Sequence, residues 1–253
     1  MSGTRSPSPT APATDPREVV LIAFGSLSDP SPQDAAIAAL AEEVAAERPG
    51  WRVRGATMAA EGSIAAAFDG LGPGAEVFPL LMSDGWLLRR VLRDALAAVG
   101  RGDAPPRTPI GLMPSFHAHC AGLIRDGLAQ AGLAAADTTV VLAAHGSARG
   151  PRPAACARAL CDELLRRTGV RAVVPGYLEE APFLADALAA APAPALCLPC
   201  FMTNAFHATS DVPGAVAESG FAGPVLAAAG TAPGIAALIA DALAVAAPGT
   251  RAA

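Results

Sequence analysis

The sequence predicts an α/β protein of two similar domains, each a parallel four-stranded sheet flanked by helices, with a cleft between the domains. Three observations favour this fold. The chain resembles itself at offsets of 115 to 121 residues, its apolar runs are short and do not alternate, and amphipathic segments separate those runs. At about 150 residues per domain, a chain of 253 residues has room for two small domains.

The internal repeat is visible in three pairs of segments that occur in the same order in each half. Their nearly constant offset indicates one duplicated unit rather than a solenoid of small repeats. The pairs are residues 19–26 (VVLIAFGS) with 140–147 (VVLAAHGS), residues 79–84 (PLLMSD) with 199–204 (PCFMTN), and residues 118–128 with 233–243.

Eight short apolar runs, four in each half, are the predicted strands. Runs of this length without clean alternation are typical of parallel strands that are buried on both faces. Amphipathic segments between them, such as residues 34–47 and 154–167, predict right-handed strand–helix–strand crossovers. The predicted strands are residues 19–24, 51–58, 76–81 and 108–113 in the first half and residues 139–144, 171–177, 195–201 and 224–228 in the second.

The domain boundaries follow from this pattern. We predict an N-terminal domain at residues 18–133 and a C-terminal domain at residues 134–248. Residues 1–17 are rich in Ser, Pro and Thr and lack an apolar signal core, so we expect a disordered tail rather than a secretion signal.

Composition excludes several classes of protein. The net charge of −5 argues against a nucleic-acid partner, which usually requires a basic face. All 18 basic residues are Arg, so a Schiff-base lysine and a phosphate-loop lysine are excluded. The sequence contains no run of about 18 apolar residues, so it gives no indication of a membrane span. Five irregularly placed cysteines suit a reducing compartment, and we expect a cytoplasmic protein.

Two of the four histidines follow predicted strands of the second half. His145 comes directly after the strand at residues 139–144, and His207 lies six residues beyond the strand that ends at Phe201. Ligands of parallel α/β sheets bind beyond the carboxyl ends of the strands. The first-half counterparts are Phe24 and Leu87, which bind neither metals nor protons. The sequence therefore predicts one working site per chain, built mainly by the C-terminal half.

Three motifs of the second half resemble the CbiX/SirB/CbiK family, the class II chelatases of cobalamin and siroheme synthesis. They are His-Gly-Ser at residues 145–147, Tyr-Leu-Glu-Glu-Ala-Pro at residues 177–182, and Pro-Cys-Phe-Met at residues 199–202, which leads to His-Ala-Thr-Ser-Asp-Val-Pro at residues 207–213. The resemblance spans roughly residues 18–246. It implies a chelatase-like fold and an enzyme that inserts Co²⁺ or Fe²⁺ into sirohydrochlorin or a related tetrapyrrole, with the metal as substrate and no organic cofactor.

The resemblance also implies roles for individual residues. His145 and His207 would be the catalytic pair, which binds the metal and accepts protons, and Glu179 would be a further metal ligand, with Glu180 as its rival. The chemistry suits these residue types, because neutral imidazole accepts a proton near pH 7 and, with a carboxylate, binds first-row divalent metals. Members of two-domain type often carry their histidines in the N-terminal half; here the C-terminal placement is more like that of CbiK.

Other residues near these motifs are candidates for binding the carboxylates of the tetrapyrrole. Arg149 and Arg152 lie beside the His145 turn, and Arg89 lies across the predicted cleft. Ser147 either binds substrate or caps the following helix. Asp211 is predicted to start a helix or to orient His207 through a hydrogen bond.

Several alternatives remain open on the sequence. The same site could serve a metal or tetrapyrrole carrier without turnover, or Ser147, His207 and Asp211 could form a hydrolase triad, although no Gly-x-Ser-x-Gly elbow is present. A phosphate-handling enzyme is disfavoured by the lack of lysine. A redox or zinc role for the Cys-x-x-Cys at residues 197–200 is disfavoured because it lies within a predicted strand. His117 and His119 begin a predicted helix and could face the cleft. We expect no membrane partner, and a monomer or homodimer.

Overall fold

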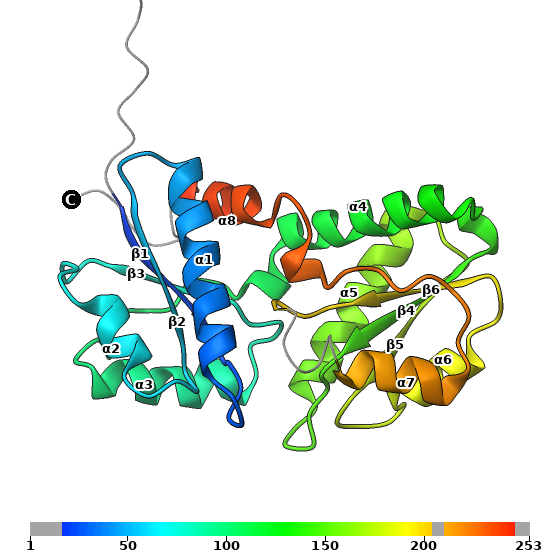
Figure 1. The fold of residues 1–253 in the computed structure, drawn as a ribbon, viewed down its shortest axis with the longest axis horizontal. Helices are drawn as coiled ribbons and strands as arrows, with labels where there is room; N and C mark the ends of the chain where they lie inside the picture. The colour runs from blue at the N-terminus through cyan, green and yellow to red at the C-terminus, as the bar shows by residue number, and fades with distance from the viewer. Residues whose placement is uncertain (1–16, 204–209, 246–253) are drawn as a thin grey trace, which may run out of the picture.

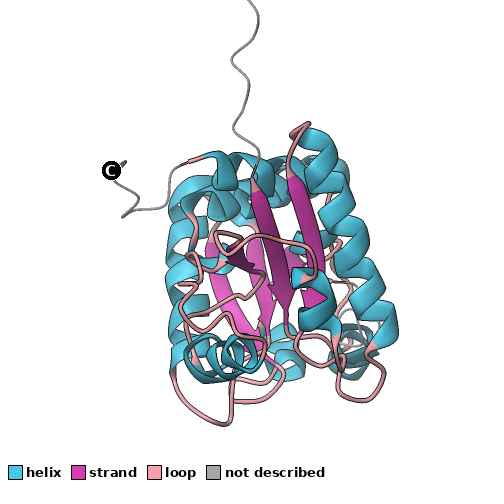
Figure 2. Ribbon diagram, turned by 90° about the vertical axis from the view of Figure 1, so that its left-hand side faces the viewer, coloured by secondary structure: helices cyan, strands magenta, loops and turns pink. Residues whose placement is uncertain are grey.

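The computed structural model describes residues 17–203 and 210–245. His207 and, apart from Arg17, the predicted tail lie outside these described residues. The chain forms an α/β structure with two parallel sheets, and Figure 1 shows the two halves side by side. Figure 2 shows the strands in the centre with helices on both sides of them. The predicted fold class is confirmed in these respects.

The first sheet has three parallel strands in the order β2-β1-β3. They are β1 (Glu18–Ala23), β2 (Arg52–Thr57) and β3 (Glu76–Pro79). β1 is the central strand, and five of its six residues are buried. A central parallel strand is covered on both faces, which explains why this run is uniformly apolar.

The second sheet has the same strand order, β5-β4-β6. Its strands are β4 (Thr139–Ala144), β5 (Ala172–Tyr177) and β6 (Ala195–Pro199). β4 is central and buried throughout. A duplicated unit would give the same strand order in both sheets, as observed. The duplication itself stays a prediction.

The prediction of four strands in each sheet is wrong. Residues 108–113 and 224–228 run beside β3 and β6 but form only isolated pairings, such as the single bridge between Cys197 and Val225. In the first half the N–H of Arg107 donates to Val77 at 2.9 Å, and then Pro109, which has no N–H, interrupts the ladder before a 3₁₀ turn at Ile110–Leu112. The fourth position of each sheet is therefore an irregular extended segment.

In the part of the chain that the structure describes, six helices flank the sheets. In the first half they are α1 (Ser31–Glu47), α2 (Ser63–Phe68) and α3 (Arg93–Ala98), the last preceded by a π-helical segment at Leu87–Leu92; in the second they are α5 (Arg152–Thr168), α6 (Leu184–Ala190) and α7 (Val212–Ser219). Within the described ranges, no helix has the length and apolar character required to cross a membrane.

Two further helices cross between the halves. α4 (Pro114–Ala131) ends the first half of the sequence but packs against α5 and β6 of the second, whereas α8 (Ile235–Ala244) packs against α1 of the first (Figure 1). Each helix buries a stripe of residues spaced four apart, such as Ile235, Ile239 and Leu243 in α8. One apolar core cluster consequently contains residues of both halves. The predicted boundary between residues 133 and 134 stays a prediction.

Candidate functional site

The candidate site begins where β4 ends. β4 ends at Ala144, and His145 is the next residue. The chain then turns at Gly146, whose φ of +70° lies in the left-handed region. A Cβ atom at this position would lie 2.9 Å from Cβ of Tyr177 and 3.0 Å from Cγ of Glu180. Glycine is therefore required by the backbone conformation and by the close approach that holds the His145 loop against the end of β5.

His145 and Glu179 face each other across this approach. Nδ1 of His145 lies 3.5 Å from Oε2 of Glu179, and the two side chains are 44% and 50% exposed. The backbone holds them together, because the N–H of Glu179 donates to the carbonyl oxygen of His145 at 3.0 Å. An imidazole nitrogen and a carboxylate oxygen are ligands that first-row divalent metals accept. The structure thus brings together one histidine and one glutamate of the predicted site, in reach of solvent.

Glu180 has different surroundings. Its Oε1 accepts a hydrogen bond from the N–H of Ser147 at 2.7 Å, and its side chain lies against Gly146. This carboxylate satisfies a partly buried backbone donor of the turn. Of the two adjacent glutamates, Glu179 is the one that faces His145.

The predicted partner, His207, belongs to residues 204–209, which lie outside the described residues. Asp211 is the N-cap residue of α7, as its predicted helix start requires; its predicted hydrogen bond to His207 stays a prediction. Within residues 17–203 and 210–245, no three His, Cys, Asp or Glu side chains are placed so that they could hold a metal ion together. The described part of the site supplies one imidazole and one carboxylate.

Ser147 does not cap the helix that follows it, so this part of its prediction is wrong. α5 begins five residues later, at Arg152, with Pro151 as the N-cap residue. The hydroxyl oxygen of Ser147 instead accepts a hydrogen bond from the N–H of Arg149 at 3.1 Å and closes a short turn within the loop. Its substrate-binding role stays a prediction.

Two of the three predicted substrate-binding arginines pair with one acidic side chain of the first half. The Asp84 carboxylate accepts hydrogen bonds from Arg89, at 2.8 Å, and from Arg152. The hydrogen bond from Arg89, with the positive charges of both guanidinium groups, lowers the pKa of Asp84 below its ordinary value. Asp84 follows β3, whereas Arg152 begins α5, so this cluster links the two halves beside the His145 loop.

The third arginine, Arg149, lies over an aromatic ring of the first half. Its guanidinium carbon is 4.7 Å from the ring centroid of Trp86, a cation–π contact. Sequence reasoning missed both Trp86 and Asp84. The repeat alignment offered a signal, because it matches residues 79–84 with residues 199–204, so that the segment after Asp84 is the counterpart of the loop that carries His207.

The other two histidines of the chain bind backbone carbonyls. Nε2 of His117 lies 3.0 Å from the carbonyl oxygen of Gly111, and Nε2 of His119 lies 3.0 Å from that of Ala229. Both histidines belong to the first turns of α4, as the predicted helix start requires. These contacts connect α4 to corresponding turns of the two halves, which is a structural role.

The Cys-x-x-Cys pattern does not form a pair of neighbouring thiols. Cys197 packs in the core on one face of the second sheet, whereas Cys200 belongs to the core cluster that both halves share. Residues three apart along a strand point to opposite faces. Burial raises the pKa of Cys197 to about 12, which keeps the thiol protonated and unreactive near neutral pH.

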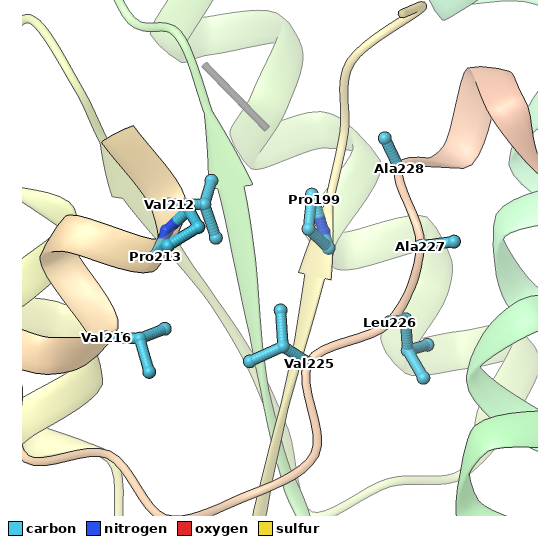
Figure 3. A pocket seen from close by; sticks show the side chains of 8 residues that line it. All are labelled: Pro199, Val212, Pro213, Val216, Val225, Leu226, Ala227 and Ala228. Carbon is cyan, nitrogen blue, oxygen red and sulfur yellow. The ribbon is translucent and has the colours of Figure 1, made fainter. Parts of the chain in front are cut away.

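An apolar pocket of about 320 Å³ lies beside the end of β6, where α7 begins (Figure 3). Proline, valine, leucine and alanine side chains line it, and among the described residues of its lining none can titrate or bind a metal. The described part of its lining therefore supplies none of the groups that the predicted chemistry needs. The lining residues are Pro199, Val212, Pro213, Val216, Val225, Leu226, Ala227 and Ala228.

Known proteins and structures resemble this chain. The CbiX family model matches residues 139–246. The structure of CbiX, described as the terminal enzyme for biosynthesis of siroheme in denitrifying bacteria, is 39% identical, with a TM-score of 0.81 over 90% of this chain and 98% of that one. No curated protein sequence matches the chain.

Two more distant structures share the fold. SirB from Bacillus subtilis with Fe³⁺ is 16% identical, with a TM-score of 0.67 over 90% of this chain and 94% of that one. DR2241 from Deinococcus radiodurans, a multi-domain protein with structural similarity to chelatases, is 21% identical, with a TM-score of 0.65 over 90% of this chain and 54% of that one. At these identities the likeness concerns the fold alone.

Proposed function

Because the chain belongs to the CbiX family of class II tetrapyrrole chelatases, we propose that it inserts a divalent metal, cobalt or iron, into sirohydrochlorin or a closely related tetrapyrrole. The observation that carries this proposal is the facing pair of His145 and Glu179, which lie just beyond the carboxyl ends of β4 and β5. The pair lies at the edge of the sheet where ligands of parallel α/β proteins bind.

The proposed site must bind the metal ion and then release it. Neutral imidazole of His145 and the carboxylate of Glu179 would bind the ion, and His207 would add a second imidazole. A site of few ligands with open positions suits a metal that is a substrate better than a closed four-ligand site does. The half-exposed side chains of His145 and Glu179 support this reading, since the ion can enter from solvent and leave towards the macrocycle.

Metal insertion also requires proton acceptors. The free-base macrocycle loses its pyrrolic protons as the metal enters, and a histidine with an ordinary pKa of about 6.5 is mostly neutral at pH 7. His145 and His207 would accept these protons. Glu179, next to Nδ1 of His145, would stabilise the imidazolium that forms.

The test is anaerobic incubation of the pure protein with sirohydrochlorin and either Co²⁺ or Fe²⁺, followed by the absorbance of the tetrapyrrole. His145→Ala and His207→Ala should each lower the insertion rate by about 10²-fold or more, because a general base contributes about 10²–10⁴-fold. A rate above about a tenth of the wild-type value in both variants would refute the assignment.

A matched control is His117→Gln, which removes an imidazole elsewhere but keeps a donor for the Gly111 carbonyl. This variant should insert metal at close to the wild-type rate. Comparison of the Co²⁺ and Fe²⁺ rates identifies the preferred metal. Binding of both substrates by the wild type without any turnover would make the protein a carrier and contradict the proposal.

A further inference from the structure

An exposed tryptophan lies beside the His145 loop. The chain has two tryptophans: Trp51 is buried, with 7% of its surface exposed, whereas Trp86 is 49% exposed. Trp86 follows β3 of the first half, and Arg149 of the His145 loop lies over its ring. Arg149 is itself exposed. An aromatic ring and a cation thus stand together at the surface, contributed by opposite halves of the chain.

The surroundings of Trp86 hold this pair in place. The neighbouring Asp84 pairs with Arg152 of α5 and with Arg89. Gly85 lies close to Pro153: a Cβ atom added to Gly85 would be 3.5 Å from Cγ of that proline. The segment on which Trp86 stands is thereby anchored to the start of α5, a few residues after His145. An anchored aromatic ring loses little freedom when it binds a ligand.

We propose that Trp86 and Arg149 form a substrate-contact wall, in which the indole ring stacks on the tetrapyrrole macrocycle and the guanidinium group binds one of its carboxylate side chains. The inference rests on the proposed function. It says how the first half, which has no histidine at the end of a strand, takes part in substrate binding. A conjugated macrocycle rimmed with carboxylates matches this pair in shape and in charge. Asp84 positions the wall through its pair with Arg152, whose own role in binding substrate carboxylates stays a prediction.

The alternative is that the cation–π contact only connects the two halves. In that case Trp86 and Arg149 would affect stability and leave tetrapyrrole binding unchanged. The two roles are separable, because binding can be measured without metal and independently of turnover.

The experiment is a metal-free, anaerobic titration of each protein with sirohydrochlorin, followed by the change in tetrapyrrole absorbance. Trp86→Ala should raise the dissociation constant about tenfold and Trp86→Phe by less, because a phenyl ring still stacks. Trp86→Leu, which keeps apolar bulk without a π-system, should bind nearly as weakly as Trp86→Ala. Arg149→Ala should also weaken binding, and its affinity should depend less on salt than that of the wild type.

Matched controls are Trp51→Phe, at the buried tryptophan, and Arg166→Ala, at an exposed arginine that pairs with Glu163 on α5. Both should bind sirohydrochlorin as the wild type does. In the insertion assay, Trp86→Ala should raise KM for the tetrapyrrole and leave kcat nearly unchanged, as expected for contacts made equally in the ground and transition states.

The outcomes separate this inference from the proposed function. The substrate-contact wall is contradicted if Trp86→Ala and Arg149→Ala both bind sirohydrochlorin with wild-type affinity. It is also contradicted if Trp86→Leu alone does so. Either result holds whether or not the protein inserts metal. If the wild type binds sirohydrochlorin through Trp86 but inserts no metal, the chelatase proposal is contradicted and the substrate-contact wall is still supported. A wild type that does not bind sirohydrochlorin overturns both.

Discussion

Glu179 and Glu180 are neighbours in the sequence with different partners in the fold. Glu179 lies half-exposed next to Nδ1 of His145, whereas Glu180 accepts the N–H of Ser147 and lies against Gly146. One carboxylate is therefore accessible to an incoming cation, and the other shapes the turn that presents His145. Substitutions at the two positions should have different effects.

Glu179→Gln should lower metal affinity and the insertion rate by about tenfold or more, since even residues that only orient a metal ligand contribute that much. The free energy of unfolding should be nearly unchanged, because the side chain is half-exposed. Metal titration, insertion kinetics and urea unfolding would be compared. The Glu179 assignment is wrong if metal binding and insertion stay at wild-type levels.

Glu180→Ala leaves the partly buried N–H of Ser147 without its acceptor and should cost about 1–3 kcal/mol of unfolding free energy. Glu180→Gln should restore most of this stability, because its amide oxygen can accept the same hydrogen bond. Urea unfolding at pH 7 measures both. Equal stability of wild type and Glu180→Ala would show that the turn does not depend on this contact.

Corresponding turns of the two halves contain the same close approach of backbone to backbone. The N–H of Gly111 donates to Leu81 at 3.0 Å, and the N–H of Gly230 donates to Phe201 at 2.8 Å. A Cβ atom added to Gly111 would lie 2.4 Å from Cα of Met82. One added to Gly230 would lie 2.3 Å from Cα of Met202. Each turn therefore packs against the segment that follows β3 or β6, which are the segments next to the candidate site.

Gly111→Ala should destabilise the protein by about 1–3 kcal/mol or more, since the new methyl group meets backbone atoms that cannot rotate away. The matched control is Gly122→Ala within α4, where a Cβ atom meets nothing within 4 Å. This helix-interior change should stabilise by about 0.5–1 kcal/mol. Thermal and urea unfolding should show a lower free energy of unfolding for Gly111→Ala and a higher one for Gly122→Ala. A Gly111→Ala variant as stable as the wild type contradicts the argument.

The two halves are joined by the helices α4 and α8, each of which packs against the half to which it does not belong in sequence. Arg107 of the first half adds to this connection, because its guanidinium group donates to the carbonyl oxygen of Leu243 in the last turn of α8 at 3.0 Å. The Asp84–Arg152 pair connects the halves again, beside the candidate site. With one core cluster shared between them, we expect the halves to unfold together.

Leu243→Ala should lower the unfolding free energy by about 2–5 kcal/mol, because Leu243 is fully buried in the shared core. Both tryptophans lie in the first half, so their fluorescence reports on that half while far-UV circular dichroism reports on the whole chain. The two signals should give one midpoint in urea, before and after the substitution. Separate midpoints would mean that the halves unfold independently. Leu165→Ala, at an exposed position of α5, should change stability by less than about 0.5 kcal/mol.

Local sequence patterns predicted where His145 of the candidate site lies in the fold. The uniformly apolar runs of β1 and β4 predicted buried parallel strands, and the position of His145 directly after such a run predicted its place at the sheet edge. The motif at residues 177–182 predicted a glutamate nearby, but not which one. That choice depends on the side-chain packing around Gly146, which the order of residues does not specify.

The sequence by itself determined the strand–helix alternation and the residue types available for chemistry, because these follow from hydrophobic period and local backbone preference. Only the tertiary structure decided that the fourth segments are irregular, that α4 and α8 cross between the halves, and that Asp84 and Trp86 meet Arg152 and Arg149. The physical reason is that such contacts join residues far apart in the chain, where burial and charge pairing over the whole molecule outweigh local preference.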